Sequence, residues 1–138
     1  FGKILRYFHD EKKPTALICH APVALLAALQ DPDEFVKFYE KNDKSGIKDL
    51  SKNWIYANYK MAVFTTREEI SVEGNKNSQL EGFVRFYPDA ILENAGAFVL
   101  KKDLWQSNVV RDRELITGQN PFSHEEFSSS LVNALKEM

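Results

Sequence analysis

The residues best suited to chemistry in this sequence are Cys19 and His20, which stand side by side between two apolar stretches. The stretch Thr15–Ile18 predicts a short buried strand, and residues 21–30 predict a helix. A strand that turns sharply into a helix with a nucleophile at the corner is a nucleophile elbow. The positive end of the helix dipole favours a thiolate at that corner. The pattern therefore predicts that Cys19 is a reactive nucleophile rather than a small buried apolar residue.

His20 can act as general base and acid for such a thiol if a carboxylate orients its ring. That carboxylate is expected at another strand end, because the carboxyl ends of parallel strands share one edge of a sheet. Glu68 and Glu69 follow a strand predicted at residues 59–66, so either can reach His20. The alternative is a solvated pair of glutamates with no specific role.

The remaining histidines and acids do not predict a second site. His9 is expected on the exposed end of the first helix, and His124 in a Ser-x-x-Glu capping box that opens the last one. No H-x-x-x-H pair and no cluster with metal-ligand spacing occurs, which predicts no catalytic metal. The glycine-rich loops of nucleotide-binding folds are also missing, so no nucleotide cofactor is expected.

Length and composition predict one folded domain, since the chain has 138 residues of which 43% are hydrophobic. The net charge of −2 gives no reason to expect nucleic acid or an anionic membrane surface as a partner. No apolar run approaches the ~20 residues of a membrane span. The single cysteine cannot form an internal disulfide, which suits the reducing cytoplasm, where a reactive thiol survives.

Strands and helices alternate along the chain. Helices are predicted at residues 1–10, after the Asp31-Pro32-Asp33 break, at 80–94 and after Ser123, with a polar surface loop at 41–52. Further strands are predicted at 54–56 and 97–100, with a hairpin formed by 109–110 and 114–117. This alternation predicts an α/β sandwich around a mostly parallel sheet.

The chain opens with Phe1-Gly2-Lys3 rather than Met, and its first residues have the apolar spacing of an amphipathic helix. We therefore expect the sequence to be the C-terminal part of a longer chain, beginning inside a domain.

Three segments together resemble the ThiJ/PfpI superfamily, which has the class I glutamine amidotransferase-like fold. Ala16-Leu-Ile-Cys19-His20-Ala-Pro22 resembles its nucleophile elbow, and Val63-Phe64-Thr65-Thr66-Arg67-Glu68-Glu69 resembles its strand and acidic loop. Leu115-Ile-Thr-Gly118-Gln119-Asn120-Pro121-Phe-Ser123 is similar to its C-terminal ITGQNPxS signature. The resemblance implies a flavodoxin-like three-layer sandwich with a mostly parallel sheet whose N-terminal strands are missing. Residues 1–138 would then be a single domain, the C-terminal portion of a ThiJ/PfpI-like domain.

The most similar branch is that of glyoxalase III enzymes and holding chaperones, which carry Cys-His at the elbow. The resemblance implies Cys19 as nucleophile, His20 as general base and acid, and Glu69, rather than Glu68, as the acid that orients His20. Members of this branch convert methylglyoxal to lactate without glutathione. The implied activity is a lyase for small reactive aldehydes in stress protection, without a cofactor and as a homodimer. A holding chaperone or a cysteine amidase or peptidase is the alternative.

The chain departs from the family pattern in three places. The upstream glutamate that hydrogen-bonds the cysteine, and the glycine-rich loop that supplies an oxyanion donor, would both lie before Phe1. The connector at residues 37–53 is longer than usual. The turn Asp112-Arg113-Glu114 lacks the family's glycine, which is favoured where a turn needs positive φ.

Overall fold

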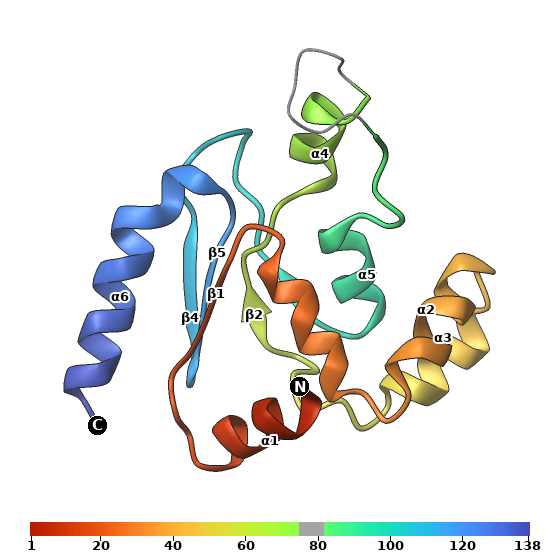
Figure 1. The fold of residues 1–138 in the computed structure, drawn as a ribbon, viewed down its shortest axis with the longest axis horizontal. Helices are drawn as coiled ribbons and strands as arrows, with labels where there is room; N and C mark the ends of the chain where they lie inside the picture. Colours follow the sequence, from red (N-terminus) through yellow and green to blue (C-terminus); the bar gives the residue numbers. More distant parts are fainter. Residues whose placement is uncertain (75–81) are drawn as a thin grey trace.

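The fold, seen in a computed structural model that describes residues 1–74 and 82–138, combines a small mixed sheet with helices (Figure 1). In chain order the elements are α1 (Gly2–Asp10), β1 (Thr15–Ile18), the 3₁₀ helix η1 (Ala21–Ala28), α2 (Pro32–Glu40), α3 (Lys44–Ser51), β2 (Lys60–Met61), α4 (Thr66–Val72), α5 (Pro88–Asn94), β3 (Phe98–Val99), β4 (Val109–Asp112), β5 (Leu115–Gly118), the 3₁₀ turn η2 (Pro121–Ser123) and α6 (His124–Lys136). No helix among these is both long and apolar enough to cross a membrane.

The main sheet has the strand order β1-β5-β4. β1 and β5 run parallel, with Thr15 opposite Leu115 and Ile18 opposite Gly118, whereas β4 runs antiparallel to β5. β2 and β3 form a separate parallel pair. The prediction of a mostly parallel sheet is therefore corrected to a small mixed one, because the tight hairpin between β4 and β5 imposes an antiparallel pairing.

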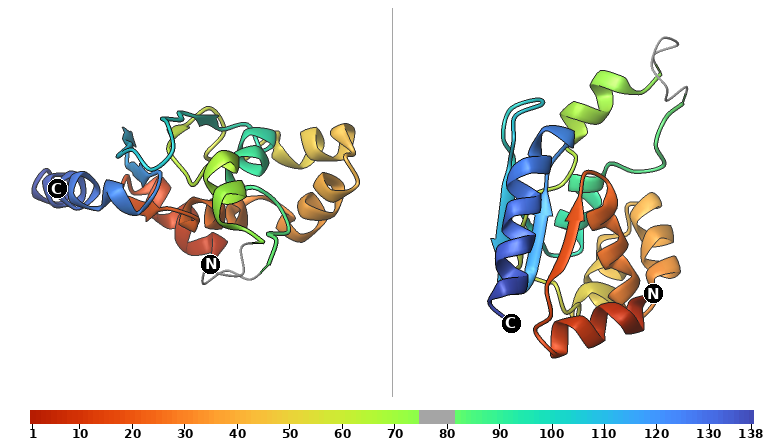
Figure 2. Two further views of the ribbon diagram at one scale, coloured as in Figure 1. Left: turned by 90° about the horizontal axis from the view of Figure 1, so that it is seen from above. Right: turned by 60° about the vertical axis from the view of Figure 1, so that its left-hand side comes forward.

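Helices lie on both sides of this sheet. α6 contacts β1, β4 and β5 on one side, and η1 and α5 lie on the other, with α1 packed against η1 (Figures 1 and 2). This arrangement is compatible with a three-layer α/β fold. The carboxyl end of β1 opens directly into η1, below α4 in the view of Figure 1.

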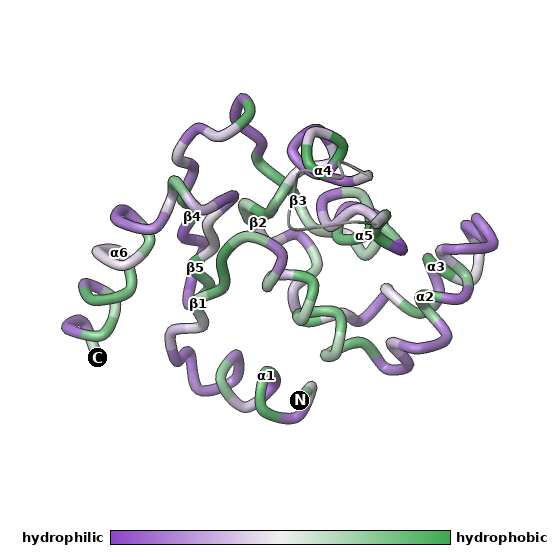
Figure 3. Tube along the Cα trace, turned by 45° about the horizontal axis from the view of Figure 1, so that its top comes forward, coloured by the Kyte–Doolittle hydropathy of each residue, from purple (hydrophilic) through white to green (hydrophobic). Residues whose placement is uncertain are grey.

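The hydrophobic core lies against η1, whose residues are all apolar. The tube of Figure 3 runs hydrophobic along β1 and η1, whereas α2, α3 and α6 carry many hydrophilic residues. Leu25 is fully buried, and its carbonyl accepts a hydrogen bond of 3.0 Å from the indole of Trp54. Burying a leucine side chain contributes about 1.5–3 kcal/mol, so η1 is held mainly by its apolar side chains. It ends at Ala28, two residues earlier than predicted, because Leu29 is extended.

One helix lies where a loop was predicted. α3 occupies residues from the polar stretch 41–52, and Asp43 caps it by accepting hydrogen bonds from the N–H groups of Ser45 and Gly46. Ile47 of this short helix is buried, and the half-buried Leu50 also packs against the core. The prediction of a loop was wrong because the polar composition of residues 41–52 was given more weight than the helix-capping residue Asp43 and the two apolar residues that follow it in the helix.

Other elements also differ from the sequence-based predictions. The helix predicted at 80–94 begins at Pro88, which occupies the first helical position and starts the helix rather than bending it; residues 80 and 81 lie outside the described part of the chain. Ser123 precedes α6 but does not cap it, because its hydroxyl lies against the backbone of Asn108. Residues 54–56, which were predicted to form a strand, lie in turns, and only Lys60–Met61 of the strand predicted at 59–66 pairs with another strand.

Candidate active site

Cys19 sits in a left-handed backbone conformation at the corner between β1 and η1. Its φ is 63°, a value that L-residues other than glycine adopt at a cost of roughly 1–2 kcal/mol. The corner is held on both sides, because the Cys19 N–H donates to the carbonyl of Gly118 and the Cys19 carbonyl accepts from the N–H of Phe64, both at 2.9 Å. The strand-to-helix turn predicted from the sequence is present at this cysteine.

The side chains of Cys19, His20 and Glu69 form a continuous row. Cys19 Sγ lies 3.3 Å from His20 Nδ1, and His20 Nε2 lies 2.5 Å from Glu69 Oε2. Glu69 is buried, whereas 44% of the His20 side chain is exposed. The imidazole also stacks on Phe64, with ring centroids 4.6 Å apart. Hydrogen bonds at both nitrogens and the stacked ring together fix the orientation of His20.

The surroundings of His20 favour its charged form. Its hydrogen bond with Cys19 and then the one with Glu69 raise the pKa of His20 to about 9, although partial burial acts in the opposite direction. At neutral pH the imidazolium therefore donates through Nε2 to Glu69 and through Nδ1 to the sulfur. An imidazolium beside a cysteine favours the thiolate, which is the nucleophilic form.

The start of α4 decides which glutamate meets His20. Thr65 caps this helix in a capping box, in which Glu68 reaches back to the Thr65 N–H at 2.9 Å. Successive side chains of a helix point about 100° apart, so Glu69 faces a different direction. The structure therefore brings together Cys19, His20 and Glu69, and it turns Glu68 away from the histidine.

The sequence predicted no role for three residues that contact either His20 or Glu68. Phe64 packs against His20, and the buried amides of Gln119 and Asn120 donate to Glu68 at 3.0 and 2.7 Å. Polar residues before a proline indicate a turn, and one sequence offers no sign that these two amides are buried.

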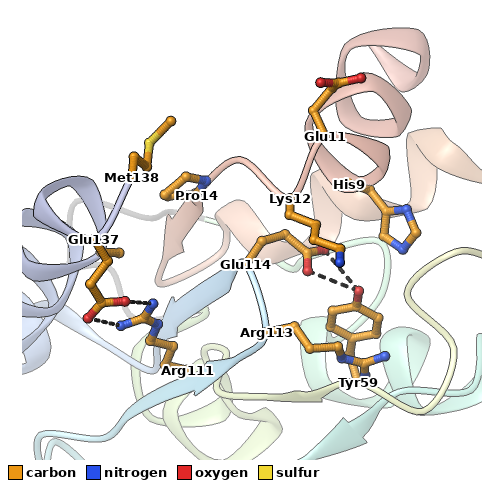
Figure 4. Close-up of a pocket in the computed structure, with 11 residues that line it drawn as sticks. His9, Glu11, Lys12, Pro14, Tyr59, Arg111, Arg113, Glu114, Glu137 and Met138 are labelled. Carbon is orange, nitrogen blue, oxygen red and sulfur yellow. Dashed lines mark hydrogen bonds and ion pairs between the residues drawn. The ribbon is translucent and has the colours of Figure 1, made fainter.

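A cavity of about 770 Å³ lies at the opposite edge of the sheet from Cys19, beside the amino ends of β1 and β5 (Figure 4). Its charged groups mostly engage one another: Arg111 pairs with Glu137, Arg113 stacks over Tyr59, and the Tyr59 hydroxyl donates to Glu114. His9 lines this cavity, so it is not at the site of Cys19. In the described residues no group of three or more His, Cys, Asp and Glu side chains could hold a metal ion.

The chain is similar to two solved structures of longer proteins. It is 26% identical to the protein APC35852, with a TM-score of 0.67 over 99% of this chain and 50% of that one. It is 25% identical to the Rapid Encystment Protein of 24 kDa (REP24) from Francisella tularensis, with a TM-score of 0.68 over 97% and 48%. The chain thus spans about half the length of each. No protein-family model matches it, nor does any curated protein.

Proposed function

We propose that the chain is the C-terminal portion of a ThiJ/PfpI-like domain, with a flavodoxin-like sandwich completed by strands from the rest of that domain. The elbow at Cys19 and the parallel pairing of β1 with β5 support this proposal. Within the described residues β1 pairs on one side only, with β5, which leaves its other edge free for a further strand. The solved structures of twice the length are consistent with such a missing half.

The proposed activity is a glutathione-independent, glyoxalase III-like conversion of methylglyoxal or a similar small aldehyde. One observation carries it: a strained Cys19 at the elbow lies 3.3 Å from a histidine whose other nitrogen is 2.5 Å from a buried carboxylate. This row can hold a thiolate and move a proton at one histidine nitrogen, which are the two operations that the reaction needs.

The proposed reaction starts from the thiolate of Cys19 and the imidazolium of His20. The thiolate adds to the aldehyde carbon, and His20 Nδ1 gives its proton to the new alkoxide, which yields a hemithioacetal. The now neutral His20 removes the proton from that carbon, which gives an enediolate, and returns it to the neighbouring carbon. The hydroxyl proton of the first carbon passes to the oxygen of the second, and the product is a lactoyl thioester. Water then cleaves the thioester to lactate and free thiol. One carbon is oxidised and its neighbour reduced, so no external electron acceptor enters the balance. Glu69 keeps Nδ1 facing the sulfur throughout.

The test is lactate formation from methylglyoxal by the purified protein and by Cys19→Ser. We expect the serine variant to lose the activity, because a serine hydroxyl is a far weaker nucleophile near pH 7. Glu34→Gln is the control for a substitution away from the site. Glu34 pairs with Lys37 on the surface of α2, and this variant should keep wild-type turnover. Equal lactate production by wild type and Cys19→Ser would refute the proposal.

A cysteine amidase or peptidase is the second candidate, and the same row favours it. A Cys-His pair oriented by a carboxylate also serves acyl transfer. The covalent intermediate on Cys19 distinguishes the two candidate activities. An amidase would accumulate an acyl-enzyme with an activated ester, visible as a mass increase on Cys19, while making no lactate from methylglyoxal.

A further inference from the structure

Glu68, the glutamate that does not touch His20, is a fully buried carboxylate. In the described part of the chain no cationic side chain pairs with it; amide, hydroxyl and backbone donors surround it instead. Its Oε2 accepts from the N–H and the hydroxyl of Thr65, both at 2.9 Å. Burial opposes its ionisation, but the hydrogen bonds from Gln119, Thr65 and Asn120 outweigh that effect and hold the pKa of Glu68 below its usual value.

The other oxygen of Glu68 joins two distant loops. Oε1 accepts from the amides of Asn120 at 2.7 Å and Gln119 at 3.0 Å, and from the backbone N–H of Trp105 at 3.2 Å. Trp105 has a left-handed backbone, with φ of 62°, so this loop is held in a conformation that its residue type disfavours. One carboxylate thus connects the first turn of α4, the loop before β4 and the turn after β5.

Each of these three segments holds one member of the catalytic row. α4 carries Glu69, the residue that follows Glu68. Trp105 packs edge-on against Phe64, on which His20 stacks. The turn after β5 continues from Gly118, whose carbonyl accepts the hydrogen bond of Cys19. A shift of the carboxylate would therefore move all three supports of the row together.

We propose that Glu68 is a positioning residue that holds Glu69, His20 and Cys19 in reactive register by tying α4 to the loops of Trp105 and Gln119-Asn120. The inference rests on the proposed use of Cys19, His20 and Glu69 in catalysis. Glu68 touches no reacting atom and acts through Glu69 and through the Trp105–Phe64 contact. Glutamine cannot replace it, because either orientation of its amide places an NH₂ group against hydrogen-bond donors.

The test is the rate of Cys19 alkylation by iodoacetamide as a function of pH, since this rate follows the thiolate fraction. In Glu68→Gln a misplaced Glu69 stabilises the imidazolium less, so the pH at half-maximal rate should rise by about one unit. Alkylation below that midpoint should then be about tenfold slower. Glu69→Gln should show the same shift, and the double variant should add little to it, because Glu68 acts through Glu69.

Asp89→Asn is the matched control. Asp89 is also buried and also reaches α4, where it accepts from the Thr66 hydroxyl at 2.5 Å. It pairs with Lys101 at the start of the loop before β4, whereas the hydrogen bonds from Trp105, Gln119 and Asn120 go to Glu68. The alkylation profile of Asp89→Asn should stay at the wild-type midpoint. An unshifted profile in Glu68→Gln, or an equal shift in Asp89→Asn, would overturn the proposal.

If Glu68→Gln does not fold, Asn120→Ala decides. This variant removes the 2.7 Å donor to Glu68 Oε1, the 2.8 Å hydrogen bond from the Asn120 amide to the carbonyl of Gln106, and the Asn120 cap of η2. Its midpoint should rise in the same direction by a smaller amount, and an unchanged midpoint would contradict the role of Glu68.

Iodoacetamide labels the thiol whatever the natural substrate is. A protein that makes no lactate yet shows the predicted shifts would thus refute the glyoxalase activity and leave the positioning role standing.

Discussion

At the scale of single residues, the unusual feature is a cysteine with positive φ whose sulfur faces a charged histidine. Left-handed backbone at a non-glycine residue costs stability and is concentrated at functional sites. Here the two backbone hydrogen bonds to Gly118 and Phe64 hold Cys19 in this conformation. This loss of stability is explained if the function of the turn is to place the sulfur of Cys19.

We predict that the ring of His20 titrates near pH 9, as its hydrogen bonds to Cys19 and Glu69 raise its pKa to about 9 from 6.5. NMR titration of the ring should show this midpoint. It should fall in Glu69→Gln and fall further in Cys19→Ala, because the bond to Cys19 is the largest cause. A wild-type midpoint near 6.5 would show that the row is not charged at neutral pH.

The same titration affects stability with a definite sign. Because the folded pKa is raised, the row stabilises the fold fully below about pH 6.5, and this contribution is lost as the pH rises through about 9. The free energy of unfolding in urea should therefore decline over that range more in wild type than in Cys19→Ala. Solvent screens the half-exposed His20, so the difference should be modest.

At the scale of elements, the contact between the ends of β1 and β5 positions the nucleophile. A side chain at Gly118 would place its Cβ 2.9 Å from Ile18 Cγ1 and 3.3 Å from Ser123 Cβ. The two strands can approach this closely, and Gly118 can accept from the Cys19 N–H, because this position is glycine.

We predict that Gly118→Ala lowers the free energy of unfolding by about 1–3 kcal/mol, since the added methyl must displace Ile18 or β1. Urea denaturation measures the loss, and alkylation of Cys19 should slow because the elbow moves with β1. The loss should be smaller in an Ile18→Ala background, which removes the atoms that clash. If the loss is the same in both backgrounds, the Ile18 contact is not its cause.

At the scale of the whole molecule, several large apolar side chains are exposed, which is the kind of surface that a holding chaperone would need. Phe83 is 81% exposed and Phe122 61%. Binding of unfolded clients depends on such exposed area, whereas aldehyde conversion depends on one thiol. We therefore predict that Cys19→Ser keeps whatever suppression of client aggregation the wild type shows. Light scattering of a heated client enzyme measures it, and loss of suppression in that variant would tie the two functions together.

Sequence patterns predicted the region around Cys19 better than the rest of the chain. β1 spans Thr15–Ile18 as predicted, because a short apolar run that follows Pro14 and precedes a helix favours a buried strand. The strand predicted at 59–66 was too long, because residues 62–65 are apolar or β-branched but leave the ladder after Met61. Their burial comes from tertiary contacts, which make the same residue types suitable for an extended loop.

The sequence by itself determined that a cysteine and a histidine meet at a strand-to-helix corner, because they are neighbours in the chain and the flanking patterns are local. It also narrowed the third partner to Glu68 or Glu69, and the family resemblance implied Glu69. Only the tertiary structure decided between them: the capping box at Thr65 sets the rotation of α4, and Glu69 then meets His20 at 2.5 Å while Glu68 is buried among amides. Such a choice depends on how one helix is placed against a strand 50 residues away, and no local pattern encodes that placement.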